Sequence, residues 1–499
     1  MSVPTTDRSV FVPPPIDGLN LVAHPTAFLP TEARKLDNYR VFDHGIRQVG
    51  APTRNHQNSE GPGMMFKYLQ SGTSTQRMLY TEGTKLYRLD APTDAAGTDV
   101  TAALVITNSL FFPCYHNKRI FLFNGVDAPI VHDLGTGNAT ATGLTGPTIA
   151  NLVQGCSYNH RLYAVDQYTT SFWYGGVDAI TGAMTEFDVG QVLNQPGFLS
   201  FVLSWTTNQG QSNQDFFVAV SSSGEVLVYS GDYPTHPNWF LIARGQIPEL
   251  YFPEMNQPYC RLGTDIIIST TQGLVKLSSV FAGINPTDPL YTVSRKIKDK
   301  CKSSKSAIVD KNNPFLYAAN NVGSGIGDIY CQNYERGAWS RIPHGALTTN
   351  STIAALEIFG DYLMVSTGGT DHSLWRYPVA LGTASSSLNY RWATPGFDFG
   401  GKNLQKQSNM VRVLGRNVAN SSTFKNTVSV STDFVDPASP ITDVKTTSVA
   451  ADTEVIQELA PPGVGRRLSY DFNRAGVSAI NELNEILGFE AHYSEGGIY

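Results

Sequence analysis

Seven short hairpin patterns follow one another along the chain at an almost constant interval. Each joins two largely alternating apolar runs through a turn signal such as Ser-Gly, Glu-Gly or Asn-Gly. The hairpins occupy residues 78–89, 119–134, 161–174, 216–229, 265–277, 315–334 and 362–377. Their starts lie 41 to 55 residues apart, which leaves room for two more strands in each interval. Four strands in roughly 40–50 residues is the repeat of a β-propeller blade.

This periodicity predicts a propeller of about seven blades over residues 61–384. An ordinary β-sandwich with seven hairpins is the alternative, but it would not need so regular a period. The stretch SSSGEVLVYSGDYPTHPNW (221–239) then forms the middle of a blade, and Trp239 and Phe240 begin its outer strand and pack between blades. Gly224 and Gly273 fall where hairpin turns commonly need positive φ.

The two ends of the chain have different patterns. Residues 1–60 are rich in proline and are predicted to form an extended arm, whose part 33–50 leads as a short strand into the first blade. Residues 385–499 are predicted to form a separate β-sandwich of six to eight strands, with one short helix over 473–485. The runs expected to form strands there are 388–394, 409–416, 426–432, 454–460, 466–472 and 486–493.

Composition supports an all-β protein and limits its partners. Only 16% of the residues are charged, and 45 glycines suit a structure with many turns. The net charge of −6 argues against chain-wide affinity for nucleic-acid phosphates. Five dispersed cysteines indicate reduced thiols in a cytosolic product, and no apolar run has the length of a signal sequence or of a membrane span.

The sequence holds no recognisable catalytic or metal-binding motif. Walker A, GxSxG, HExxH, EF-hand and dinucleotide patterns are absent. The glycines of 323–327 indicate a wide turn, and the pair His132-Asp133 indicates a turn or strand end. The stretch 333–343 keeps only the Gly-Ala-Trp part of a sialidase Asp-box. We therefore expect no enzyme, metal or cofactor, although sequence alone does not exclude a pair of distant carboxylates that cleaves glycans.

Two segments are candidates for contacts with partners. The basic cluster of 295–305 is either a solvated loop or edge strand, or a contact to an acidic partner surface or to passing DNA. Its cations are Arg295, Lys296, Lys298, Lys300, Lys302 and Lys305. The arm carries apolar side chains that need cover, from its own propeller, a neighbouring subunit or a tail adaptor. The arm residues proposed for assembly are Phe11, Val12, Ile16 and Leu19.

Three stretches, 217–248, 258–280 and 329–342, resemble a family of structural proteins from the tails of short-tailed bacteriophages, the tail nozzle or hub family. The matching residues are Gly224, Glu225, Val226, Val228, Tyr229, Gly231, Pro234, Trp239, Gly263, Asp265, Gly273, Leu277, Asn333, Ala338 and Trp339. Thr264 departs from the family pattern by separating Gly263 from Asp265. Gly45, Ile46, Arg47 and Gly50 are similar to the family's opening strand.

The resemblance covers the propeller and the arm. It implies a virion protein, assembled in the bacterial cytoplasm, that forms a homo-oligomeric and usually six-fold ring around the DNA exit channel. Its expected partners are the portal, the adaptor and tail fibre or spike proteins, with genomic DNA passing through without sequence-specific binding. The alternative is a propeller that binds or cleaves carbohydrate at the host surface, where Trp173, Trp205 and Trp375 could stack on sugars or pack between blades.

Overall fold

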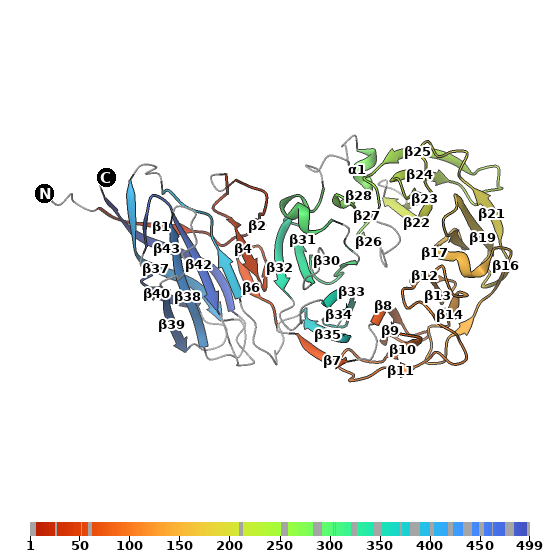
Figure 1. Cartoon of the computed structure of the whole chain (residues 1–499), viewed down its shortest axis with the longest axis horizontal. Helices are drawn as coiled ribbons and strands as arrows, with labels where there is room; N and C mark the ends of the chain where they lie inside the picture. The colour runs from red at the N-terminus through yellow and green to blue at the C-terminus, as the bar shows by residue number, and fades with distance from the viewer. Residues whose placement is uncertain are drawn as a thin grey trace.

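All seven predicted hairpins form, and each supplies the second and third strands of its own sheet. The structure is a computed structural model. It describes residues 6–24, 27–50, 52–57, 62–208, 213–250, 258–282, 292–302, 304, 306–320, 327–343, 351–369, 372–379, 390–399, 404–417, 423–432, 442–448, 454–461, 463–474 and 484–496. Figure 1 shows the sheets arranged in a ring, with a β-sandwich beside it.

The sheets of the ring follow one another in chain order. The first holds β8 (Pro62–Leu69), β9 (Gln76–Glu82), β10 (Lys85–Leu89) and β11 (Thr98–Asp99). The second holds β12 (Phe112–His116), β13 (Arg119–Phe123), β14 (Ile130–His132) and β15 (Thr140–Ala141). The third holds β17 (Leu152–Tyr158), β18 (Arg161–Asp166), β19 (Ser171–Val177) and β21 (Thr185–Asp188), following the 3-10 turn Ile149–Asn151. Beside it, β16 (Gly143–Thr145) pairs in parallel with β20 (Thr181–Ala183).

The fourth sheet holds β22 (Leu199–Asn208), β23 (Asn213–Ser221), β24 (Glu225–Ser230) and β25 (Phe240–Gln246). The fifth holds β26 (Tyr259–Leu262), β27 (Asp265–Thr270) and β28 (Gly273–Lys276), followed by helix α1 (Leu277–Phe281) and a 3-10 segment (Arg295–Lys300). The sixth holds β29 (Ala307–Val309), β30 (Phe315–Asn320), β31 (Asp328–Asn333) and β32 (Ala338–Pro343). The last holds β33 (Ser351–Phe359), β34 (Tyr362–Gly369), β35 (Ser373–Pro378) and β7 (Thr53–Gln57).

The prediction of an all-β propeller is confirmed, and the blade count differs slightly from it. Among the described residues, five blades are separate four-stranded sheets, the fifth blade in order has only three strands, and the four strands of the sixth blade belong to a larger sheet. The last blade takes its outer strand, β7, from the chain that precedes the first blade. Because β7 and β35 belong to distant parts of the chain, this pairing fastens the two ends of the ring together.

Aromatic packing joins neighbouring blades. Trp239 stacks on Tyr229 with ring centroids 5.1 Å apart and also contacts Tyr158 of the preceding blade, as its position predicted. Phe240 begins β25 but remains exposed, so the prediction that it packs between blades is wrong. Its side chain alternates with that of Leu241, which contacts the core instead.

The C-terminal region is a two-layered sandwich, and all six predicted runs form strands. One layer joins β40 (Glu454–Leu459), β37 (Gln405–Asn417), β43 (Asn484–Gly496), β6 (Ile46–Gln48) and β5 (Tyr39–Val41), with β1 (Thr6–Val12) on β43 and β41 (Gly463–Gly465) on β37. The other layer joins β4 (Lys35–Asp37), β36 (Tyr390–Ala393), β42 (Leu468–Arg474), β38 (Thr423–Thr432) and β39 (Thr442–Ser448). Phe489 packs between the layers against Trp392, Tyr470 and Phe472. The helix predicted over 473–485 lies largely outside the described residues.

The N-terminal segment belongs to this sandwich, which corrects two expectations. β1 pairs along its whole length with β43, so residues 6–12 form a strand of the sandwich instead of an extended arm over the propeller. The segment 33–50 enters the sandwich rather than the first blade, because Leu36, Tyr39 and Ile46 are buried in the sandwich core. β2 (Gly18–Leu19) and β3 (Glu32–Ala33) pair with each other, and β2 also pairs with β32.

Candidate functional site

A cavity of about 640 Å³ lies where the innermost strands of several blades converge. Strands β8, β12, β26, β29 and β33 line it, together with the turn after β29. Its aromatic lining includes Phe66, Tyr68, Phe112, Tyr115 and Tyr259. Concave sites that combine apolar walls with a few polar groups are the usual places for ligands, so this cavity is the candidate site of the propeller.

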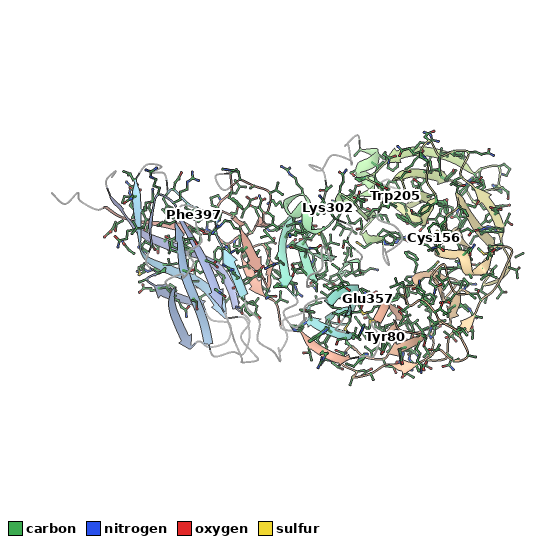
Figure 2. All side chains as sticks on the ribbon, viewed as in Figure 1. Tyr80, Cys156, Trp205, Lys302, Glu357 and Phe397 are labelled. Carbon is green, nitrogen blue, oxygen red and sulfur yellow. The ribbon has the colours of Figure 1, made fainter. Side chains whose placement is uncertain are left out.

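A buried carboxylate, Glu357 on β33, is the most unusual group in the cavity. Figure 2 places it on the inner side of the ring. Its Oε1 lies 3.8 Å from Lys67 Nζ and accepts a hydrogen bond of 2.9 Å from the Ile358 amide. Its Oε2 accepts a 3.4 Å hydrogen bond from the Lys67 amide. Burial raises the pKa of Glu357, while Lys67, the two amides and Lys311 oppose that shift.

Two further charged residues of the cavity, Asp310 and Arg261, are held by structural contacts. Asp310 is buried and accepts hydrogen bonds from the Asn312 amide at 2.9 Å and from Asn313 Nδ2 at 2.8 Å, which fix its own turn. Arg261 donates from Nη2 to the Ser204 carbonyl at 2.7 Å. These contacts fix Asp310 and Arg261 within the fold, whereas Lys311, next to Asp310 in the lining, is exposed.

The basic cluster proves to be a connection to the N-terminal segment. Residues 295–300 form a 3-10 segment, not an edge strand, and Ile297 is buried beneath it. Lys296 Nζ donates to the Asp17 carbonyl at 2.9 Å and pairs with Glu32 Oε1 at 3.0 Å. The Leu21 amide also donates to the Lys296 carbonyl at 2.8 Å, so Lys296 binds a part of its own chain.

Among the described cations of the cluster, Arg295, Lys300 and Lys302 do not line the cavity. Arg295 and Lys300 are exposed, and Lys302 is half-buried. The side chain of Lys298 and the whole of Lys305 lie outside the described residues. Partner or DNA contacts by these cations therefore stay a prediction.

Of the four proposed arm residues, three contribute to the chain's own core. Val12 and Leu19 are buried in it, and Ile16 packs against it. Phe11 is the exception, with 54% of its side chain exposed on β1. The apolar side chains that needed cover thus find most of it within the sandwich.

The other sequence signals have structural roles. His132 is buried at the end of β14, where its Nδ1 accepts from the Leu134 amide at 3.2 Å, as a turn role predicts. Trp173, Trp205 and Trp375 all pack against hydrophobic clusters between sheets. The glycine-rich stretch 323–327 lies almost wholly outside the described residues.

The described part of the chain contains no disulfide and no group of side chains that could bind a metal ion. All five cysteines are free and buried. No group of three or more His, Cys, Asp or Glu side chains there has an arrangement that could hold a metal ion. None of the helices described has the length and apolar character that crossing a membrane requires.

Sequence reasoning missed Glu357 and Lys67, the ion pair of the cavity. A signal was present, because Glu357 stands alone in the apolar run IAALEIF and Lys67 in MMFKYL. A single charged residue within a strand otherwise made of buried positions needs a partner inside the fold. The sequence alone does not indicate which strands of the blades line the cavity, so the two residues could not be placed together.

The similarities to known proteins concern the propeller alone. No protein-family model and no curated protein matches the chain. Matching solved structures include YCF48 bound to a D1 peptide, with 10% identity, a TM-score of 0.40 and coverage of 70% of this chain and 99% of that one.

Two further matches are propeller domains. The Cps50 (Swd1) β-propeller of Myceliophteria thermophila has 10% identity, a TM-score of 0.43 and coverage of 67% and 100%. The WD40 β-propeller of Doa1 has 10% identity, a TM-score of 0.40 and coverage of 66% and 96%. Likenesses this distant carry no argument about function.

Proposed function

We propose that this chain is a structural component of a bacteriophage short tail, which forms a ring as the nozzle or hub around the DNA exit channel. In this role it sits below the portal and adaptor and offers docking surfaces to tail fibre or spike proteins. The resemblance of its blade motifs to that family is the starting point. The proposal places the protein in the virion and assigns it no catalysis.

The observation that carries the proposal is the joining of propeller and sandwich into one body. A single sheet runs from β29 of the sixth blade through β32 and β4 to β39 of the sandwich. At the joint, the Arg341 guanidinium holds both carboxylate oxygens of Asp37, at 2.7 and 2.8 Å. Bidentate pairs of this kind fix orientation as well as distance.

The shared core strengthens this joint. Trp339 of the sixth blade, Leu36 of β4 and Phe489 of the sandwich belong to one continuous hydrophobic cluster. An interior packed in this way transmits strain instead of absorbing it. Such a body suits a component that must keep its shape while it carries other tail proteins and while DNA passes.

Electrostatics are consistent with a conduit for DNA. The chain carries a net charge of −6, and phosphates are repelled by a negative wall. Of the cations that line the cavity, Lys67 and Arg261 have partners within the fold, and Lys311 is exposed.

The experiment is to locate the chain in the virion. Particles assembled with a tagged copy are labelled against the tag and imaged in negative stain. We expect label around the tail axis in a ring below the portal. Label on the capsid, label at the tips of fibres, or purified particles without the protein would overturn the proposal.

A second candidate function, carbohydrate binding or cleavage, is favoured by one specific observation. The cavity brings together aromatic walls and two carboxylates, Asp310 and Glu357, and burial raises the pKa of Glu357 as a general acid requires. Turnover of a host polysaccharide that is abolished by Glu357→Gln but retained by Gln76→Ala at the rim would support this alternative. Absence of both glycan binding and turnover in the wild-type chain would exclude it.

A further inference from the structure

Both edges of one sandwich sheet are open. Four of its strands lie side by side in the order β1, β43, β37 and β40. No described strand pairs with the far side of β1 or with the far side of β40. An open strand presents unpaired backbone N–H and C=O groups, which form a template for another strand.

The β1 edge is charged only near its start, at Asp7 and Arg8, and its last four residues, 9–12, are uncharged. Its seven residues pair with β43 in an unbroken register from Thr6 opposite Glu495 to Val12 opposite Phe489, with no bulge. Phe11 is 54% exposed and Val10 is 37% exposed.

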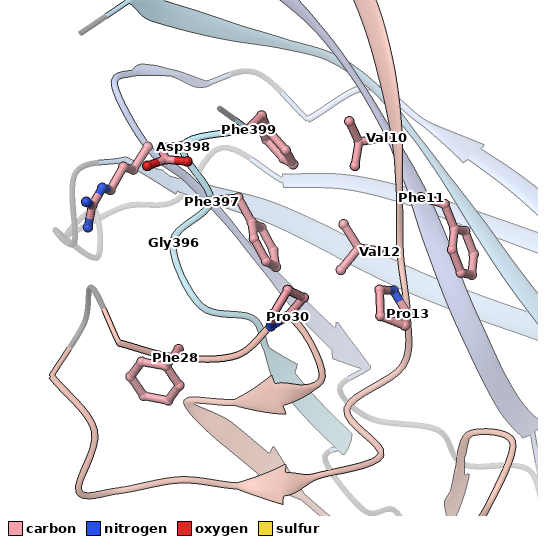
Figure 3. Close-up of a pocket in the computed structure, with 11 residues that line it drawn as sticks. Val10, Phe11, Val12, Pro13, Phe28, Pro30, Gly396, Phe397, Asp398 and Phe399 are labelled. Atoms are coloured by element: carbon pink, nitrogen blue, oxygen red, sulfur yellow. The ribbon is translucent and has the colours of Figure 1, made fainter. Parts of the chain in front are cut away.

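An apolar groove opens along this edge. A hollow of about 350 Å³ lies beside Val10. Figure 3 shows Phe28, Pro30, Phe397 and Phe399 among the side chains that line it. Long, regular and apolar edge strands are predicted association sites, so β1 is one.

The β40 edge is equally regular. Its six residues pair with β37 from Glu454 opposite Arg416 to Leu459 opposite Val411, again without a bulge. Ile456 is 63% exposed, which makes it one of the most exposed large apolar side chains in the described part of the chain.

We propose that the β1 edge of one copy binds the β40 edge of the next copy, so that the sheet continues from subunit to subunit. Strand direction favours this occupant. Each of the three pairings between β1, β43, β37 and β40 is antiparallel, so the two edge strands run in opposite directions. A second copy in the same orientation therefore meets the first in an antiparallel ladder.

The register between β1 and β40 of the next copy follows from the side chains that lie on the same face of the sheet. Arg412 lies opposite both Glu490 and Glu458 and is within ion-pair distance of each, at 3.5 and 2.9 Å. Because Phe11 lies opposite Glu490, and Ile456 is two residues from Glu458, both apolar side chains are on that same outer face.

Charges do not clash when Phe11 lies opposite Ile456. In this register Ser9, whose hydroxyl hydrogen-bonds Glu490 of its own chain, faces Glu458 as an uncharged residue. Arg8 and Asp7 face Leu459 and Ala460, so no two like charges are opposed. An aromatic side chain beside a β-branched one is a favourable cross-strand pair.

The joint is heterologous, since it uses two different edges, and such contacts close into rings when the rotation per subunit allows it. The inference rests on the proposed ring function and supplies its mechanism of assembly. The joint would cover Phe11 and Ile456, two apolar side chains that are exposed in the single chain.

Cysteine cross-linking tests the joint in the full-length chain. The variants Phe11→Cys and Ile456→Cys are prepared separately, mixed and oxidised; the five native cysteines are buried and give little background. We expect a disulfide-linked dimer from the mixture and ladders of higher multiples from the double variant. A matched control mixes Ile456→Cys with Val177→Cys, an exposed position on a blade, and should stay monomeric on a non-reducing gel.

Each other outcome overturns part of the account. Cross-linking of Phe11→Cys only to itself would show a two-fold contact and refute the joint. A wild-type oligomer without any Phe11–Ile456 cross-link would refute the joint and leave the ring standing. A wild-type chain that stays monomeric would refute both. As a second readout, Phe11→Asp should weaken self-association at least tenfold with an unchanged melting temperature.

Discussion

Replacing Gly224 by alanine should destabilise the fourth blade through a specific steric clash. Gly224 ends the turn between β23 and β24 with φ of +85°, a conformation that L-residues adopt at a cost of about 1–2 kcal/mol. A Cβ atom there would lie 2.2 Å from the Ile247 carbonyl oxygen and 2.9 Å from that of Pro248. These are backbone atoms of the two residues that follow β25, so they cannot rotate away as a side chain could.

A matched control, Gly263→Ala, separates the steric cost at Gly224 from the conformational cost of a positive φ. Gly263 turns between β26 and β27 with φ of +61°, and a Cβ there would meet nothing within 4 Å. Gly263→Ala therefore has only the conformational cost of about 1 kcal/mol, reduced by a lower entropy of the unfolded chain. Gly224→Ala adds displacement of the β25 end, at about 1–3 kcal/mol as for other overpacked sites.

Thermal melting of both variants beside the wild type measures the difference. We expect Gly224→Ala to melt roughly 2–4 °C below Gly263→Ala, because about 2 kcal/mol shifts Tm by about 4–8 °C in domains of 150–250 residues and by less in a larger propeller. Equal melting temperatures for the two variants would refute the argument, because only the contact with Ile247 distinguishes them.

Three further predictions concern charges and the N-terminal strand. Lys67→Met should lower the free energy of unfolding in urea by about 1–3 kcal/mol, because it leaves the buried Glu357 carboxylate without its cation. This loss should exceed that of Glu357→Gln, and an equal or smaller loss would contradict the ion pair. Burial lowers the pKa of His116 and of His132, so below about pH 6.5 the unfolded chain binds more protons than the folded chain. Tm should therefore fall as pH falls, and less steeply in His132→Gln than in the wild type. Identical curves of Tm against pH for the two proteins would refute this. Deleting residues 2–12 removes β1 and should lower the melting temperature of the sandwich, which a truncated chain of unchanged stability would disprove.

The blades could be predicted from the sequence because their signals are local. Alternating apolar runs and turn residues lie within a dozen or so residues of each other, as in 216–229. The positive φ of Gly224 and Gly273 follows from the same short-range turn chemistry. The six sandwich strands were also found in this way, since each carries its own alternation.

Pairings between distant parts of the chain could not be predicted. β1 pairs with β43 and β7 with β35, and no local pattern identifies either partner. The prolines around β1 favoured an arm because proline is unsuited to central strands, yet they flank a strand at a sheet edge, where proline is tolerated. The cavity was missed for a similar reason, since Glu357 becomes a site residue only when the blades close into a ring.

The mass of the purified full-length chain in solution tests the central claim, that this propeller is built to assemble into a ring. Sedimentation velocity over a range of micromolar concentrations would measure it. The account predicts a species of six times the 54.3 kDa of one chain, which Phe11→Asp converts toward single chains. A wild-type protein that sediments only as a 54.3 kDa monomer at every concentration would contradict it.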